Sequence, residues 1–204
     1  MSARALRLAG LLLALAAVGC ATTRVIHEWS NPDFGSPPRL KKVIVVGISK
    51  QESVRRSFED EFVTKLKAVG VDAVPGYRFI TEEGSVEEPR LREAVAQAGA
   101  DAMLVTRLLR MEQRYQMGPY YYYPPPPGLG FYRGYAGAWY GYYDSPTYPY
   151  EVYISETSLY DTAKNVLVWT GTVETTSADI SKNIAHYVDA VIEALQKRNL
   201  LAAS

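Results

Sequence analysis

A run of four β-branched residues, Val43 to Val46, lies near the start of the regularly patterned part of the chain. No polar residue interrupts this run, so we expect a strand whose two faces are both buried. A strand of this kind needs helices on both sides of its sheet, and a helical pattern does follow it. This feature therefore constrains the chain to an α/β fold.

Alternation with period 2, and recurrence every three or four residues, divide the rest of the chain into strands and helices. Strands are predicted at 42–48, 71–74, 102–111, 151–161 and 166–176, and helices at 54–69, 89–98 and 184–195. The order is β-α-β-α-β-(insert)-β-β-α. It predicts an α/β (α+β) domain over residues 42–200, with helices packed on a single mixed sheet.

Local signals mark the ends of the first two predicted helices. Ser49, with Glu52 three residues later, forms a capping-box pattern. Pro89 suits the first turn of the second helix. Gly70 and Gly99 follow the two helical segments and are natural C′ residues. We expect the helices to begin and end at these positions.

Residues 115–150 break the pattern of strands and helices. They contain 12 of the 16 tyrosines and seven of the 12 prolines, a composition that disfavours regular structure. Tyrosine rings can stack on sugars, contact a lipid headgroup layer or dock on a protein. A loop that merely joins two strands is the alternative. The candidate contact residues are Tyr120, Tyr121, Tyr122, Tyr123, Tyr132, Trp139 and Tyr140.

The N-terminus has the pattern of a bacterial secretory signal peptide. Arg4 and Arg7 precede an uncharged stretch over residues 8–19. As a helix this stretch would span about 18 Å, which is shorter than the hydrocarbon core of about 30 Å. We therefore predict a signal peptide over residues 1–19.

Cys20 follows this stretch and is the single cysteine of the chain, so it has no disulfide partner within it. With Ala17 and Gly19 before it, the segment resembles the lipobox of bacterial lipoproteins. The resemblance implies cleavage between Gly19 and Cys20, acylation of the Cys20 thiol by palmitate-like chains, and outer-membrane sorting because Ala21 follows. Residues 20–41 would then be the lipidated cysteine and a tether, with a short strand at 24–29. An ordinary secreted protein and an uncleaved anchor are the alternatives.

The charges exclude one class of partner. Lys and Arg number 22, as do Asp and Glu, and nucleic-acid binding needs an excess of positive charge. Within the first predicted helix, at 54–69, Glu59, Asp60 and Glu61 are expected on a solvated helix face. Arg55 and Arg56 are expected to pair with Glu59 and Asp60 at i,i+4 spacing.

Arg107 stands on a predicted strand. We expect either an exposed arginine on the strand face or, if the side chain is buried, an ion pair with Glu156 or Asp161 of the following hairpin.

No catalytic or cofactor-binding constellation is present in the sequence. The two histidines, His27 and His186, are too few for an all-His zinc site, and one cysteine cannot form a Cys-rich metal site. Gly47 is the single glycine of the first β-α turn, so a glycine-rich phosphate loop is absent. We therefore expect no enzyme activity, no metal and no cofactor.

Several short sequences together carry a family resemblance. They are Glu28-Trp29 with Pro32, Lys42-Val43 to Val46-Gly47, Arg55 to Asp60, Gly99 to Leu108, Glu156-Thr157, Leu159-Tyr160-Asp161 and Leu167-Val168-Trp169. In these the chain is similar to an uncharacterised family of small Gram-negative outer-membrane lipoproteins. More distantly, its order of elements resembles the curli-secretion and peptidoglycan-synthase-activating lipoproteins, which implies a non-enzymatic assembly or activator module.

These observations lead to one expected function and one alternative. The first is an outer-membrane lipoprotein with a periplasmic domain, held to the membrane by its lipid, that acts as an accessory or assembly factor for an unknown envelope protein. The alternative is a module that binds peptidoglycan or another glycan through the Tyr-rich insert.

Overall fold

The computed structural model describes residues 22–34, 41–81, 84–117, 130–133, 135, 147–176 and 180–201. The strands are β1 (Thr22–Ser30), β2 (Lys42–Ile48), β3 (Asp72–Pro75), β4 (Ala102–Met117), β5 (Thr147–Asp161) and β6 (Val166–Thr176). The helices are α2 (Glu52–Ala68), α3 (Glu88–Ala98) and α5 (Ile180–Lys197), with short 3-10 turns η2 (Pro32–Phe34) and η3 (Gly76–Arg78). The predicted α/β class with a single mixed sheet is confirmed.

The sheet has a parallel and an antiparallel part, and its six strands follow the order β1-β6-β5-β4-β2-β3. Strand β2 runs parallel to both β3 and β4. The β-branched run lies in β2, where Val43, Ile44 and Val45 are at most 1% exposed. Its burial on both faces is therefore as predicted.

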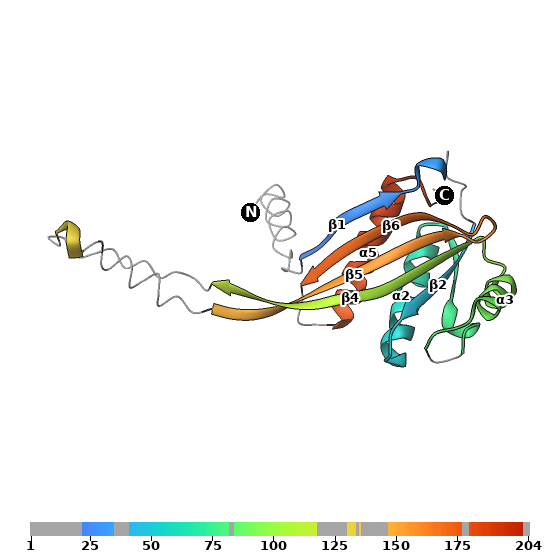
Figure 1. Cartoon of the computed structure of the whole chain (residues 1–204), viewed down its shortest axis with the longest axis horizontal. Coiled ribbons are helices and arrows are strands. Elements are labelled where there is room, and N and C mark those ends of the chain that lie inside the picture. The colour runs from blue at the N-terminus through green and yellow to red at the C-terminus, as the bar shows by residue number, and fades with distance from the viewer. Residues whose placement is uncertain are drawn as a thin grey trace, which may run out of the picture.

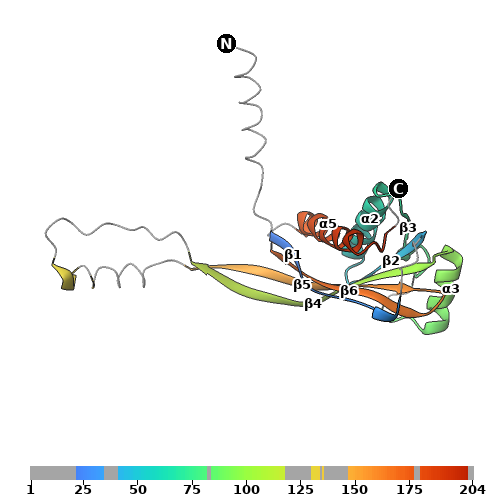
Figure 2. The same cartoon turned by 90° about the horizontal axis from the view of Figure 1, so that it is seen from above.

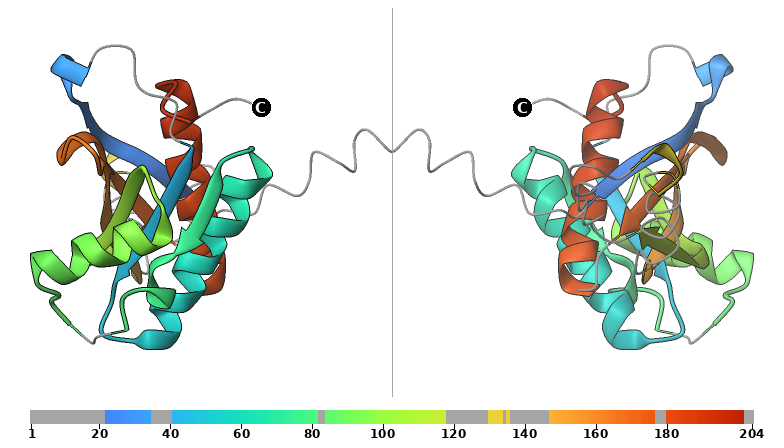
Figure 3. Two further views of the ribbon diagram at one scale, coloured as in Figure 1. Left: turned by 90° about the vertical axis from the view of Figure 1, so that its right-hand side faces the viewer. Right: turned by 90° about the vertical axis from the view of Figure 1, so that its left-hand side faces the viewer.

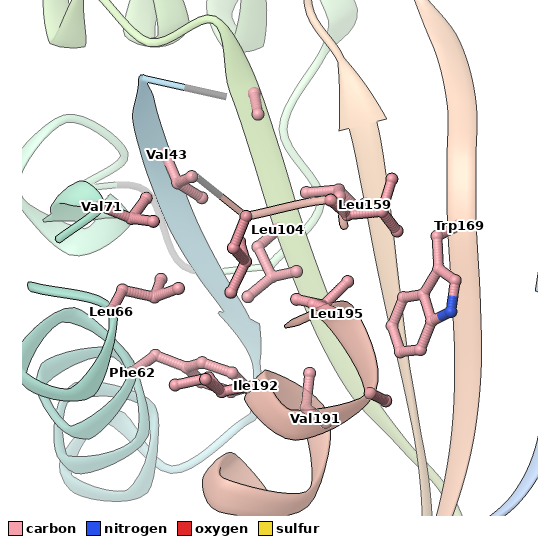
Figure 4. Close-up of a cluster of buried hydrophobic side chains, with 14 of the residues drawn as sticks. Val43, Phe62, Leu66, Val71, Leu104, Leu159, Trp169, Val191, Ile192 and Leu195 are labelled. Carbon is pink, nitrogen blue, oxygen red and sulfur yellow. The ribbon is translucent and has the colours of Figure 1, made fainter. Parts of the chain in front are cut away.

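Helices cover the two faces of the sheet unequally. Helices α2 and α5 lie together on one face, and α3 lies toward the other, beside β2 (Figures 2 and 3). The larger core fills the space between the sheet and the α2–α5 layer (Figure 4). Its fully buried members include Phe62, Leu66, Leu104, Leu159, Trp169, Val191 and Leu195. Apolar side chains that recur at helical spacing thus form this core, as expected.

The helix ends agree with the sequence in part. Gly70 and Gly99 have φ values of 85° and 62°, the left-handed conformation that a C′ glycine provides. The capping-box prediction is wrong, because the N-cap of α2 is Gln51 and no side chain caps this end. Ser49 instead accepts a 3.1 Å hydrogen bond from the Gln51 N–H, and Glu52 pairs with Arg56 at 2.7 Å.

Strand β1 corrects the expected tether. Residues 24–29 do form a strand, but it spans Thr22–Ser30 and pairs with β6 along its length. Arg198, which follows α5, forms an ion pair with Glu28 that lowers the pKa of this carboxyl group. Residues 22–30 are therefore part of the sheet.

Strands β4 and β5 are longer than predicted. Strand β4 continues to Met117, and β5 begins at Thr147. Tyr115 lies opposite Pro149 in this ladder, so both ends of the segment 115–150 belong to the sheet. Pairing with the neighbouring strand outweighs the local Tyr- and Pro-rich composition here. Among the described residues, this part of β5 pairs with β4 alone, so the Pro149 nitrogen, which has no N–H to donate, can lie on the unpaired side of the strand.

Candidate functional site

A cleft of about 410 Å³ opens where β2 ends. It lies between the first turns of α2 and α5, over the middle of β4 and β5. Its apolar lining residues are Ile48, Val54, Phe58, Leu108 and Ile184. This volume falls in the range of small-molecule sites, which is about 300–1,000 Å³.

A chain of buried hydroxyl groups forms one wall of the cleft. The hydroxyl oxygens of Thr106 and Thr157 lie 2.7 Å apart, and those of Thr157 and Tyr187 are also 2.7 Å apart. Burial raises the pKa of the Tyr187 phenol, so this group stays protonated. The ring of Tyr187 packs against Phe58 with centroids 5.4 Å apart. The network therefore positions rings and hydroxyls from three elements at the cleft.

Thr175, at the end of β6, is a second polar group at the cleft. The residue is 3% exposed, and its hydroxyl oxygen has no hydrogen-bond partner among the described residues. An unpaired buried hydroxyl costs about 1–3 kcal/mol. The hydroxyl oxygen is itself buried, so Thr175 borders the cleft through its other atoms.

The charged residues that line the cleft are all cations. They are Lys50, Arg55 and Arg107, and no carboxylate lies among the described lining residues. The Arg107 side chain is exposed, and its Nη2 lies 2.9 Å from Oε1 of Glu156. Of the two expected partners, Glu156 and Asp161, it therefore pairs with Glu156. Lys50 has no ion pair within the part of the chain that the structure describes.

Glu59 corrects the expectation of a solvated acidic helix face. Its side chain is fully buried, and its Oε1 accepts 3.0 Å hydrogen bonds from the Gly47 N–H and from Nε of Arg55. Its Oε2 accepts a 2.7 Å bond from the Tyr77 N–H. Burial raises the pKa of Glu59, and these donors oppose that shift. Because β2 and η3 both pack on this side of α2, Glu59 lies in the interior.

The ion pairs of the neighbouring residues differ from the predicted set. Arg55 does pair with Glu59, but as a buried pair, and its Nη2 also donates to the Ile80 carbonyl at 2.9 Å. Arg56 pairs with Glu52 rather than with Asp60. Asp60 instead accepts a 2.8 Å hydrogen bond from the Tyr77 hydroxyl.

Beyond the cleft, β4 and β5 continue as a two-stranded ribbon, which we call the arm. It comprises Arg110–Met117 and Thr147–Val152. Strand β2 pairs with β4 up to Arg107, and β6 pairs with β5 from Tyr153 onward. The arm therefore extends away from the rest of the sheet (Figure 1). Its exposed apolar residues are Met111, Tyr115, Met117, Tyr148 and Tyr150.

The base of the arm is tied to the sheet by ion pairs. Glu174 of β6 lies 3.1 Å from both Arg24 of β1 and Arg114 of β4. Arg114 also pairs with Glu112 at 2.8 Å. This network lies on the sheet face opposite to the cleft, because Glu174 precedes Thr175 on an alternating strand.

The comparison with protein families now adds to this geometry. The family model described as "Domain of unknown function (DUF4136)" matches residues 83–197. The chain belongs to the DUF4136 family. The matched part of this DUF4136 protein runs from the approach to α3 to the end of α5. It therefore contains both strands of the arm and four of the elements that line the cleft, namely β4, β5, β6 and α5, whereas β2 and α2 lie outside it.

The DUF4136 chain is also similar, at low identity, to solved structures. A variant PelC dodecamer from Paraburkholderia phytofirmans is 18% identical with a TM-score of 0.47, and the match covers 86% of this chain and 98% of that one. Lipoprotein GNA1162 from Neisseria meningitidis is 14% identical with a TM-score of 0.42, and the match covers 77% and 99%. No curated protein matches the chain in sequence.

Most of the predicted contact and lipidation residues lie outside the described residues. These are Gly19, Cys20, Tyr120, Tyr121, Tyr122, Tyr123, Trp139 and Tyr140. Tyr132 is described and is 87% exposed, with its ring centroid 5.6 Å from that of Phe131. Phe131 in turn stacks with Tyr135 at 6.5 Å, so three exposed rings gather here.

The remaining predictions concern metals and histidines. His27 lies on β1 and His186 on α5, and both are exposed. The described residues hold no group of three His, Cys, Asp or Glu side chains that suits a metal ion. None of the helices in the described ranges is both long and apolar enough to cross a bilayer.

The cleft and the arm were not predicted from the sequence. Thr106, Thr157, Thr175 and Tyr187 each stand in an ordinary strand or helix pattern. One signal was available for the arm. After the predicted end of the strand at Met111, the apolar residues Tyr115 and Met117 lie at alternate positions that share its face. This alternation indicates that the strand continues into the insert.

Proposed function

We propose that this DUF4136 protein is a lipid-anchored, non-enzymatic accessory protein of the cell envelope that engages a protein partner through its arm. The observation that carries this proposal is the arm itself. A two-stranded ribbon is marginally stable by itself in water, yet this one presents Met111, Tyr115 and Met117 at 58%, 66% and 53% exposure. A partner that covers these side chains would stabilise the ribbon and would also bury its exposed apolar surface.

The arm also has the backbone geometry for docking. Beyond Arg107, the outer edge of β4 has no neighbouring strand among the described residues. A free edge of this kind accepts an added strand, which supplies the missing main-chain hydrogen bonds. Alternate side chains then fall on one face, so Met111, Tyr115 and Met117 would contact the partner together.

The lipid anchor is supported by the lipobox-like sequence at Cys20. Strand β1 begins at Thr22, so one residue, Ala21, lies between an acylated Cys20 and the first residue of the sheet. Because each residue spans at most about 3.6 Å, the anchor would hold the domain close to the membrane. The start of β1 lies at the same end of the sheet as the arm (Figure 1), so with this anchor the docking surface would also lie near the membrane.

Site-specific photocrosslinking in cells tests the arm. A photoreactive residue at Met111 or Tyr115 should trap one discrete envelope protein. The same residue at Glu193, exposed on α5, serves as the matched control and should trap none. Failure of both arm positions to crosslink would contradict the proposal.

Metabolic labelling with palmitate tests the anchor independently. The wild-type chain should be labelled, and Cys20→Ser should not be labelled. Equal labelling of the two chains would overturn the lipidation proposal and would leave the arm proposal unaffected.

A second candidate function is glycan binding through the insert, which the exposed rings of Phe131, Tyr132 and Tyr135 favour. Aromatic faces of this kind can stack on sugars. Replacing residues 118–146 by Asn-Gly should then abolish retention on purified sacculi. Retention that survives this replacement would exclude the insert as the glycan site.

A further inference from the structure

The cleft has the composition of a site for an elongated apolar group. Its apolar residues come from four elements that enclose it from different sides, namely Ile48, Phe58, Leu108 and Ile184. Ile48 and Leu108 line the cleft and are 60% and 53% exposed. Covering these side chains with an apolar group would gain about 25 cal/mol per Å² of surface removed from water.

The hydroxyl groups on the β6 side of the cleft are not available to a head group. The Thr175 hydroxyl oxygen is itself buried, and it has no partner within the described residues. The hydroxyls of Thr106, Thr157 and Tyr187 are satisfied by one another. This side of the cleft therefore suits an apolar tail rather than a polar head.

The charge of Lys50 favours an anionic head group at the cleft. Of the three lining cations, Arg55 and Arg107 are paired with Glu59 and Glu156, whereas Lys50 has no ion pair in the part of the chain that the structure describes. Lys50 also lies next to the start of α2, a 17-residue helix whose N-terminal end has no side-chain cap. The uncapped N–H groups and the helix dipole favour a negative charge at this point.

We propose that the cleft binds a single acyl chain with an anionic head, of the class of long-chain fatty acids. The tail would lie against Ile48, Phe58, Leu108 and Ile184, and the head would lie near Lys50. The volume of about 410 Å³ is toward the small end of ligand sites, which suits one chain better than two.

The position of the cleft agrees with this class of ligand. Thr175 pairs with Thr23 of β1, three residues after Cys20. At about 3.6 Å per residue, an acylated Cys20 would hold this end of the sheet beside the membrane. This last argument rests on the proposed anchor, whereas the apolar lining and the charge of Lys50 do not.

The test uses the full chain carrying Cys20→Ser and a fatty acid with a fluorescent polyene tail. We expect saturable binding with one site per chain. Leu108→Glu should weaken binding at least about tenfold, because a buried charge would face the tail. Leu109→Glu is the matched control, since Leu109 is also exposed and does not line the cleft. It should change the affinity less than about twofold.

A second comparison tests the head group. Lys50→Glu should weaken binding of the fatty acid about fivefold, which corresponds to about 1 kcal/mol. The methyl ester of the same acid should bind equally to the wild type and to Lys50→Glu. Lys67→Glu, at the far end of α2, controls for the change in net charge and should affect neither ligand.

The following outcomes would overturn the proposal: absence of saturable binding, equal losses for Leu108→Glu and Leu109→Glu, or equal effects of Lys50→Glu on acid and ester. Tighter binding of a two-chain phospholipid than of the fatty acid would overturn the single-chain assignment. Ile48→Glu replaces Leu108→Glu if the latter lowers the thermal unfolding midpoint. Because the tested chain lacks Cys20, failure here is distinguishable from failure of lipidation, which palmitate labelling reports.

Discussion

The backbone N–H of Gly47 donates a 3.0 Å hydrogen bond to the buried Glu59 carboxylate, which joins the end of β2 to the middle of α2. The same carboxylate accepts from the Tyr77 N–H and from Arg55. Strand β2, helix α2 and η3 therefore meet at one side chain. Since Gly47 and Arg55 also line the cleft, this junction shapes the wall of the cleft.

Glu59→Gln should destabilise the domain by about 1–3 kcal/mol, because the amide nitrogen cannot accept a hydrogen bond and at least one of the donors Gly47, Arg55 and Tyr77 loses its partner. Urea unfolding followed by circular dichroism measures this loss. Glu193→Gln removes a carboxylate from an exposed pair with Lys197 and should cost less than about 1 kcal/mol. Similar losses in the two variants would contradict the role given to the buried junction.

The pH dependence of stability should also report Glu59. Burial raises its pKa above the ordinary value of 4.5, so the native state binds this proton more tightly than the unfolded chain does. The contribution of Glu59 to the free energy of unfolding therefore falls as the pH rises above 4.5. The stability of the wild type relative to Glu59→Gln should be greater at about pH 5 than at about pH 8. Urea titrations at both pH values measure the difference, and an opposite trend would show that the pKa is lowered.

Gly171→Ala should disturb the core around Trp169. A Cβ at this position would lie 2.3 Å from the Trp169 ring, which is fully buried. We expect a loss of about 1–3 kcal/mol as the ring is displaced, with a red shift of tryptophan fluorescence. Gly130→Ala is the control, because nothing lies within 4 Å of its added Cβ. An unchanged emission spectrum in Gly171→Ala would refute this packing.

Glu174→Gln should loosen the base of the arm. The carboxylate joins Arg24 to Arg114 and has an exposed fraction of 11%, so its loss should cost about 1–2 kcal/mol. Glu88→Gln removes a more exposed partner, that of Arg92, and should have a smaller effect. Hydrogen exchange should show faster exchange in β1 and in the arm of the Glu174 variant. Exchange rates equal to those of the wild type would contradict the bridging role.

Local pattern was enough to predict most elements of the fold. The burial of Val43 to Val45, the left-handed Gly99 and the buried face of α5 all follow from short-range periodicity and backbone sterics. The end of α2 could not be predicted in the same way. In a capping box, Ser49 would accept a hydrogen bond from the N–H of Glu52. It accepts one from the N–H of Gln51 instead, and Gln51 is the N-cap of the helix.

The candidate sites depended on contacts between distant residues. A lipobox-like motif is a local signal, so Cys20 could be singled out from the sequence. Thr106 and Thr157 are 51 residues apart, and Thr157 and Tyr187 are 30 apart. No short-range pattern relates such residues, so neither this hydroxyl network nor the cleft beside it was predicted.

By itself, the sequence determined the α/β class, the order of the elements and the position of the Tyr-rich segment, because periodicity and turn chemistry act over a few residues. The tertiary structure decided that β1 joins the sheet beside β6, that Glu59 is buried, and that β4 continues beyond the end of β2 to form the arm. Each of these depends on which surface packs against a segment. A charged helix face is solvated or buried according to the elements that pack on it. For Glu59 these are β2 and η3, and the tertiary fold brings them to α2.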